Sequence, residues 1–235
     1  MSLWKATAVR RLGTPGAPRV FGRKELADWM AQGGLHPNER TLLRALQEWE
    51  AQDIVGRPAW GVYLNRQATP TPLLEEVAQA LRPGAVVSLA SVLGRAGVLN
   101  NPSYWITATL PSTAVKAPVD VQASDGTMFR FAHMRPDLIA QPDAQWQSDA
   151  VDASAFAPTA TPEKALLDWL YLSSSARGAA RWPLPALHDL DLDELDADRL
   201  DRLAVRMELI EPLAQLRQAI DDERPHVKVR RPRLR

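Results

Sequence analysis

The feature that most constrains the fold is a proline-marked break in the stretch "RQATPTPLLEE", residues 66–76. Pro70 and Pro72 follow a strand-like segment and precede a new helical pattern, and prolines at such a junction interrupt regular structure. The break predicts an N-terminal domain over residues 1–70 and a second domain that begins at residue 71. Of the 235 residues, 46% are apolar, which is enough for a core in each part.

The N-terminal domain is predicted to contain three helices followed by a β-hairpin. In the third helical segment, Leu42, Leu46 and Trp49 recur at the spacing of an amphipathic helix, and Asn38 precedes them as an N-cap. Two short strand-like runs around a Gly-Arg-Pro turn, residues 56–58, then indicate the hairpin. The segments are "SLWKATAVRRL" (2–12), "FGRKELADWMAQ" (21–32), "NERTLLRALQEWEAQ" (38–52) and "DIVGRPAWGVYL" (53–64). This order of elements is typical of a winged helix-turn-helix.

In a winged helix-turn-helix bound to DNA, the third helix enters the major groove, and the hairpin, or wing, touches the backbone or the minor groove. An arginine that makes two hydrogen bonds to guanine contributes about 1–3 kcal/mol to discrimination between bases. We therefore expect the exposed face of the third helix to read bases and the neighbouring basic side chains to contact phosphates. The DNA-binding residues expected on this helix are Asn38, Arg40, Thr41, Arg44 and Gln47; the phosphate-contacting ones are Arg57 in the turn of the wing, Arg66 at its exit, and Arg23 with Lys24 at the start of the second helix.

The same surface has a second interpretation. Exposed arginines often form nothing more than a solvated helix face, and Glu39, Glu48 and Glu50 reduce the positive potential of this helix. Winged helices also serve as protein-docking modules. The sequence pattern alone therefore leaves DNA binding and protein docking open.

The net charge is zero, but the charges are unevenly distributed along the chain. Residues 1–70 carry 10 basic and 6 acidic side chains, residues 151–222 carry 7 and 14, and the tail 223–235 carries 6 and 1. Basic segments are attracted to polyanions, whereas acidic segments are repelled by them. The tail is predicted to be extended, and it can either add salt-sensitive attraction to DNA or act only as a solubilising or docking end.

The sequence has no apolar run long enough to cross a bilayer and no apolar segment of the signal-peptide type near its start. This pattern predicts no membrane association and a cytoplasmic location.

The second domain, residues 71–222, is predicted to be a mixed α+β domain with a small antiparallel sheet, which gives an α+β fold class for the chain. Asp125-Gly126 between two strand-like runs is a strong hairpin signal, and residues 136–158 are expected to form an irregular loop. A helix is expected after Ser88, with Ser88 as its N-cap and Gly97 as the residue that ends it. The other expected elements are a helix over 71–81, strands over 104–110, 119–123 and 127–134, a helix over 161–172, and a helix capped near Asp196.

The stretch "TPEKALLDWLYL", residues 161–172, places a Glu-Lys pair at the start of an otherwise apolar run. Thr161 is a favourable N-cap, Pro162 suits the first helical position, and Glu163 lies at the positive end of the helix dipole. The pair is therefore explained as a helix start and needs no catalytic role. Asp168 lies one turn after Lys164 and is expected to need a partner, which can be Lys164 itself.

Candidate catalytic and metal-binding groups are sparse. The chain has no cysteine, and its four histidines have no metal-binding spacing. The acidic run 189–201 has Glu194 and Leu200 where a calcium-binding EF-hand loop needs glycine and glutamate. Asp120 and Asp125 lack the accompanying lysine that a metal-dependent nuclease uses. We therefore expect a protein that is not an enzyme and has no metal or cofactor, with a winged-helix-targeted nuclease as the alternative.

Residues 20–207 resemble the AbiEi antitoxins of bacterial type IV toxin–antitoxin, or abortive infection, systems. The resemblance rests on a winged helix that runs into "GVYL", followed in order by "VVSLASVLGRAGVL", "WITATL", "GTMFRFAHMRPDLI", "TPEKALLDWLYL" and "LDLDELDADRLDRLA". The segment "TPEKALLD" is the most specific of these. The chain departs from the family in its "GTPGAP" loop and in its basic tail.

The resemblance implies that the winged helix binds inverted repeats in the promoter of its own operon and represses it. The C-terminal domain would counteract a nucleotidyltransferase toxin encoded next door, commonly without stable binding to it. Repression would depend here on Arg40, Thr41, Arg44 and Arg57. Inverted repeats imply two copies of the protein on DNA. An orphan transcriptional regulator without a toxin is the alternative.

Overall fold

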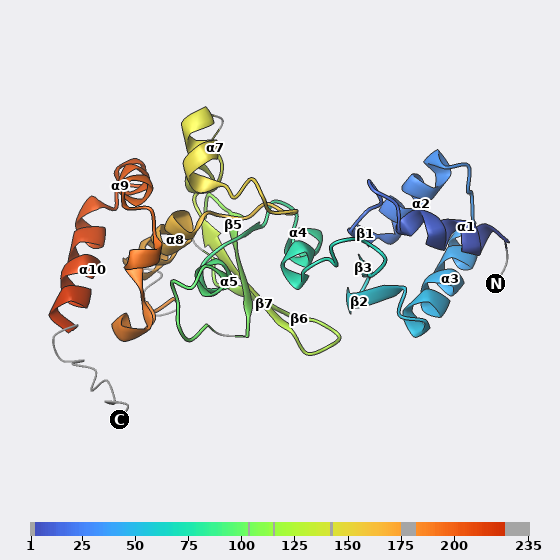
Figure 1. Cartoon of the computed structure of the whole chain (residues 1–235), viewed down its shortest axis with the longest axis horizontal. Coiled ribbons are helices and arrows are strands. Elements are labelled where there is room, and N and C mark those ends of the chain that lie inside the picture. The colour runs from blue at the N-terminus through green and yellow to red at the C-terminus, as the bar shows by residue number, and fades with distance from the viewer. Residues whose placement is uncertain (1–2, 103, 115, 142, 175–181, 224–235) are drawn as a thin grey trace, which may run out of the picture. The chain divides into compact units, whose positions relative to one another are not determined.

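The computed structural model describes residues 3–102, 104–114, 116–141, 143–174 and 182–223. The chain forms two compact units (Figure 1): the first comprises residues 1–85 and 120–129, and the second comprises 86–119 and 130–235. Both combine helices with a small sheet, so the fold is mixed α+β. Among the described residues, no helix is both long and apolar enough to span a membrane. The basic tail from residue 224 lies outside the described residues.

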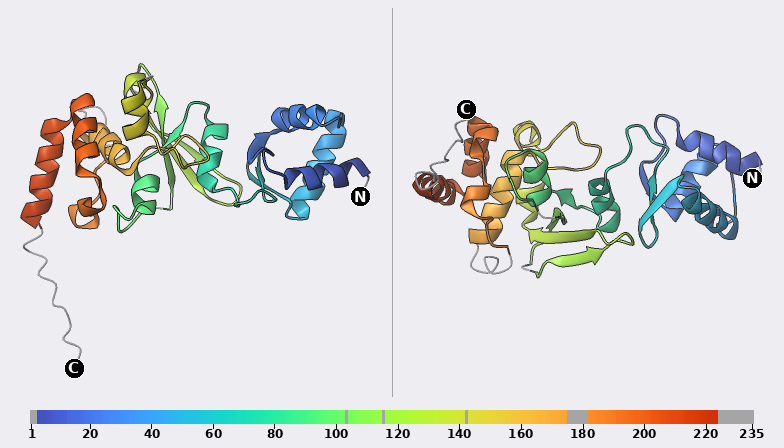
Figure 2. Two further views of the ribbon diagram at one scale, coloured as in Figure 1. Left: turned by 45° about the horizontal axis from the view of Figure 1, so that its top comes forward. Right: turned by 60° about the horizontal axis from the view of Figure 1, so that its bottom comes forward.

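The first unit combines helices with a three-stranded sheet whose strand order is β1-β3-β2, with both pairs antiparallel. Its elements are α1 (Leu3–Leu12), β1 (Val20–Gly22), α2 (Arg23–Gln32), α3 (Glu39–Ala51), β2 (Val55–Ala59), β3 (Val62–Asn65), the 3-10 turn η1 (Leu74–Glu76) and α4 (Val77–Leu81). In both views of Figure 2, the blue segments that form α1, α2 and α3 lie together beside this sheet. The three predicted helices are confirmed, and β1 is an additional strand.

A single apolar core holds α1, α2, α3 and the sheet together. Trp49 of α3 is fully buried and makes an edge-on contact with Trp4 of α1, with 6.4 Å between ring centroids. Phe21 of β1 stacks on Tyr63 of β3 at 6.0 Å, which fixes the strand that precedes α2. Aromatic pairs of this kind stabilise by about 0.5–1.5 kcal/mol beyond the burial of their area. The core therefore fixes the orientation of α3 and defines its exposed face.

The hairpin differs from the expectation in the position of its turn. The Gly-Arg-Pro residues 56–58 lie within β2, and the chain reverses at Trp60 and Gly61. Gly61 has a φ of +78°, a conformation that glycine adopts easily in a tight turn. Pro58 is tolerated because β2 is an edge strand, and the pairing register shifts between Gly56 and Ala59. The predicted turn was therefore wrong, and Arg57 does not occupy the tip of the hairpin.

The first unit extends beyond the expected boundary near residue 70, because the segment that contains α4 packs against β1 and β3. Arg19 donates two hydrogen bonds to the Glu76 carboxylate, at 2.8 and 2.9 Å, and a third to the carbonyl oxygen of Pro70. Glu76 is buried and also accepts a hydrogen bond from the backbone N–H of Leu73. These contacts attach the proline-rich segment to the first unit.

The second unit is built on a four-stranded sheet of order β4-β5-β7-β6, in which β4 and β5 are antiparallel. Thr159 adds a parallel bridge to Val87, so this sheet is mixed. The strands are β4 (Val86–Val87), β5 (Ile106–Pro111), β6 (Val119–Gln122) and β7 (Met128–Met134). By their contacts, residues 120–129, which include most of β6 and the start of β7, are grouped with the first unit. The helical elements are α5 (Ala90–Arg95), α6 (Pro136–Ile139), α7 (Ala144–Ala150), α8 (Pro162–Ser174), η2 (Leu187–Asp189), η3 (Leu192–Glu194), α9 (Ala197–Arg206) and α10 (Ile210–Glu223).

Two local predictions for the second unit were wrong. Ser88 does not cap α5: it follows β4, and its buried hydroxyl donates to Asp168 at 2.6 Å. Leu89 follows with a φ of +60° and occupies the cap position, so the helix starts at Ala90. Residues 136–158 are not simply a loop, because they contain α6 and α7, the latter capped by Asp143.

Helix α8 is the central helix of the second unit and packs against α5, α9 and α10. Thr161 occupies its cap position, where its hydroxyl accepts from the Lys164 N–H at 3.4 Å and donates to the Asp149 carbonyl oxygen at 2.7 Å. Glu163 is buried and accepts a hydrogen bond from the Asp196 N–H at the start of α9. The predicted helix start and the largely buried helix that follows are confirmed.

Candidate nucleic-acid interface

The exposed face of α3 carries two arginines one helical turn apart. Leu42, Leu46 and Trp49 are buried, so Arg40 and Arg44 project from the opposite side and are exposed. Among the described residues, neither arginine forms an ion pair. Two free guanidinium groups on a rigid helix can make bidentate hydrogen bonds to base edges or phosphates. Of the other expected residues, Gln47 is exposed and Thr41 is half-buried.

Asn38 has a defined structural role at the start of this surface. Its Oδ1 atom accepts a hydrogen bond from the Thr41 N–H at 2.9 Å, which caps α3 as expected. An asparagine N-cap is worth about 1 kcal/mol to a helix. This hydrogen bond fixes the first turn of α3 and so positions Arg40 and Thr41. Only the amide nitrogen of Asn38 can then donate a hydrogen bond to DNA.

The other basic residues of the first unit are distributed over several places. Lys24 pairs with Asp28 at 2.6 Å along the surface of α2. Arg66 follows β3 and pairs with Asp53 at 2.6 Å, at the end of the hairpin opposite its turn. Arg57 is half-buried within β2. The structure therefore does not gather all the expected phosphate contacts into one cluster, and Arg66 and Arg57 lie away from the tip.

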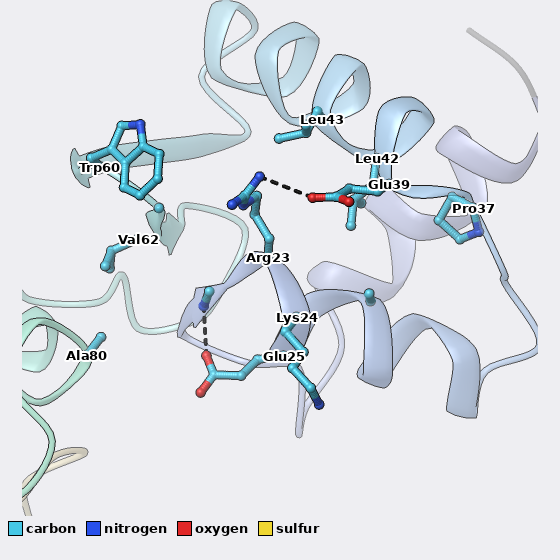
Figure 3. A pocket seen from close by; sticks show the side chains of 13 residues that line it. Arg23, Lys24, Glu25, Pro37, Glu39, Leu42, Leu43, Trp60, Val62 and Ala80 are labelled. Carbon is cyan, nitrogen blue, oxygen red and sulfur yellow. Dashed lines mark hydrogen bonds and ion pairs between the residues drawn. The ribbon is translucent and has the colours of Figure 1, made fainter.

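Arg23 lies in a groove of about 720 Å³ between the start of α2, the first half of α3 and the β2–β3 turn (Figure 3). Its Nη1 atom is 3.4 Å from Oε1 of Glu39, and its guanidinium lies 5.8 Å from the ring centroid of Trp60. The apolar wall of the groove includes Leu42 and Leu43 of α3. The groove thus combines the cations of Arg23 and Lys24, the carboxylates of Glu25 and Glu39, and the ring of Trp60. The Glu25 carboxylate accepts a hydrogen bond from the Gly22 N–H at 2.7 Å.

Trp60 is the residue of this surface that the sequence interpretation missed. Its side chain sits at the hairpin turn and is 82% exposed. A two-residue turn requires a residue that adopts a positive φ, which Gly61 supplies. An indole ring does not stabilise such a turn, so turn formation does not explain the tryptophan. The signal in the sequence was the dipeptide Trp60-Gly61, with glycine in second place between two β-branched or aromatic runs.

The second unit contains a buried polar cluster that could suggest chemistry. Lys164 and Asp168 form an ion pair and are 3% and 1% exposed, and Asp168 also accepts the hydrogen bond from Ser88. Burial raises the pKa of the Asp168 carboxyl, while Lys164 and Ser88 act in the opposite direction. Glu163 points to other partners, with Arg199 at 3.4 Å. The Glu163-Lys164 pair therefore does not form one shared site.

A cavity of about 290 Å³ borders this cluster, with Lys164 and Asp168 in its wall. Its other walls are mainly apolar and come from β4, β5, the end of α6, α7 and residues 158–160. Within the described part of the chain, no group of three or more His, Asp or Glu side chains is placed to hold a metal ion. We interpret the cluster as a buried ion pair of Lys164 and Asp168 that links α8 to Ser88, the residue after β4.

No family model matches the chain, and no curated protein matches it in sequence. Its fold is similar to that in the crystal structure of RV2827C protein from Mycobacterium tuberculosis, with a TM-score of 0.50 and 20% sequence identity. The match covers 94% of this chain and 81% of the other one. At this level of identity the likeness concerns the fold alone.

Proposed function

We propose that the protein is a DNA-binding transcriptional repressor that acts through its first unit. The observation that carries this proposal is the pair of exposed arginines, Arg40 and Arg44, on the free face of a helix whose other face is fixed in the core. Such a pair suits bidentate contacts to guanine in a major groove. The order α1, β1, α2, α3, β2, β3 supports interpreting the unit as a winged helix, with α3 as recognition helix and the β2–β3 hairpin as wing.

The resemblance to AbiEi antitoxins extends the proposal to regulation. The DNA ligand is the promoter of the protein's own operon, where inverted repeats place two copies of the protein on the duplex. The second unit counteracts a nucleotidyltransferase toxin, with or without stable binding to it, and the protein acts in the cytoplasm as a regulator and not as an enzyme. The support for this antitoxin half is the segment "TPEKALLD", which forms the start of α8. Genomic neighbourhood tests it, because the proposal expects an adjacent nucleotidyltransferase gene.

The DNA-binding half predicts salt-dependent affinity for duplex DNA. Fluorescence anisotropy of a labelled duplex from the upstream region should show the logarithm of the association constant falling linearly with the logarithm of salt concentration, with a slope of about −0.9 per phosphate contact. A protein-docking module would instead show no salt-dependent affinity. Incubation of the same complex with Mg²⁺ or Mn²⁺ should leave the duplex intact, and any turnover would favour the nuclease alternative.

A further inference from the structure

The groove beside α3 contains the Arg23 guanidinium, which pairs with the Glu39 carboxylate at 3.4 Å. Arg23 is partly exposed, with 38% of its side chain accessible, and its partner Glu39 is 78% exposed. Exposed ion pairs at this separation are weak and exchange readily. A phosphate group offers an arginine two parallel hydrogen bonds and a full charge, which is a stronger interaction than the single contact to Glu39.

The position of the groove fits one particular occupant. One wall is α3, and the opposite wall is the β2–β3 turn with Trp60. A duplex that places its major groove over Arg40 and Arg44 brings the flanking sugar–phosphate strand alongside α3, toward the wing. The apolar side chains in the groove suit the deoxyribose face of such a strand, and Arg23 suits its phosphate.

Building on the proposed DNA binding, we propose that this groove holds one sugar–phosphate strand of the bound duplex. Arg23 exchanges Glu39 for a phosphate oxygen, and the ring of Trp60 packs against the adjacent deoxyribose. Glu39 is then an internal competitor of DNA, because every binding event must displace it from Arg23. The acidic residue lowers affinity for any duplex, whatever its sequence.

The exchange of partners is tested by Glu39→Gln, which should raise affinity for promoter and unrelated duplexes alike by roughly 5-fold, because a carboxamide leaves the Arg23 charge free. Arg23→Gln should lower affinity and reduce the magnitude of the salt slope by about 0.9, the value for one phosphate contact. In the double variant the benefit of Glu39→Gln should disappear. A benefit that persists without Arg23 would show long-range electrostatics and would overturn the exchange. Glu50→Gln, on the last turn of the same helix, is the matched control for general charge effects.

The aromatic contact is tested at Trp60. Trp60→Ala should lower DNA affinity by roughly 5-fold without changing the salt slope, since an uncharged contact is lost. Trp60→Phe should retain most of the affinity. If the groove instead binds a second copy of the protein, Trp60→Ala and Arg23→Gln will change the oligomeric state in sedimentation and leave DNA affinity unchanged, which overturns the inference.

The outcomes also separate this inference from the proposed function. Loss of binding in an Arg40 and Arg44 variant, with unchanged affinity in the Arg23, Glu39 and Trp60 variants, would leave DNA binding in place and remove the groove from it. Absence of any DNA affinity in the unaltered protein would overturn both.

Discussion

Replacing Lys164 with methionine is expected to destabilise the second unit by about 3–5 kcal/mol, because it leaves the Asp168 carboxylate buried without its counter-ion. Most single domains have only about 5–15 kcal/mol of stability in total. Ser88 supplies one remaining hydrogen bond, which does not neutralise the charge. The measurement is urea unfolding followed by far-UV circular dichroism, and an unchanged midpoint would contradict the buried ion pair.

The loss should also depend on pH. Burial already raises the pKa of Asp168, and removing Lys164 removes the main influence that opposes this rise. A carboxyl whose pKa is higher in the folded than in the unfolded protein binds more protons in the folded state. The free energy of unfolding therefore falls as pH rises from the unfolded-state pKa of the carboxyl to its folded-state pKa. The stability deficit of Lys164→Met is therefore expected to be larger at neutral than at mildly acidic pH.

Two further variants show whether burial is the cause. Lys24→Met removes the same kind of i,i+4 pair, with Asp28, from an exposed helix face and should have a much smaller effect. A triple variant that makes the whole cluster apolar, Lys164→Met with Asp168→Leu and Ser88→Ala, should recover most of the stability, since no charge or hydroxyl is left unpaired. A triple variant as unstable as Lys164→Met would point instead to lost packing.

Replacing Arg40 and Arg44 together with alanine is expected to lower promoter affinity by at least about 30-fold. Each arginine that pairs with guanine is worth about 1–3 kcal/mol, and 1.4 kcal/mol corresponds to tenfold in affinity. Because both side chains are exposed, the fold should be unaffected. Anisotropy titration measures the loss, and circular dichroism checks that the helices remain.

The matched control removes two exposed arginines elsewhere. Arg82→Ala with Arg95→Ala changes the net charge by the same amount but lies outside the proposed surface. This variant should retain nearly the full affinity. Equal losses in the two double variants would mean that only total charge matters, and would remove the assignment of α3 as the recognition helix.

The parts of this fold that the sequence predicted well are those in which local signals agree with one another. In α3, the cap Asn38 and the spacing of Leu42, Leu46 and Trp49 define the same helix, and the structure has it. In α8, Thr161 and Pro162 define the start, and the apolar run after them is buried. Agreement of independent local preferences is what makes such segments predictable.

The parts that the sequence did not predict depend on contacts between distant residues. Ser88 has the chemistry of a helix cap, but its hydroxyl reaches Asp168, eighty positions later. The Gly-Arg-Pro segment has turn composition, yet it pairs in an edge strand because β3 lies beside it. The groove of Arg23, Glu39 and Trp60 is formed by α2, α3 and the β2–β3 turn, so no local sequence pattern predicts it. Tertiary context outweighed local propensity at each of these places.

Footprinting of the protein on the DNA upstream of its own gene tests the central claim most directly. A promoter-bound repressor should protect two half-sites related by inverted symmetry, with centres about 10–10.5 base pairs or a multiple of that distance apart. Protection should occur at concentrations far below those that cover unrelated DNA. Equal protection of unrelated DNA, or none at any concentration in low salt, would contradict the assignment of the protein as a promoter-binding repressor.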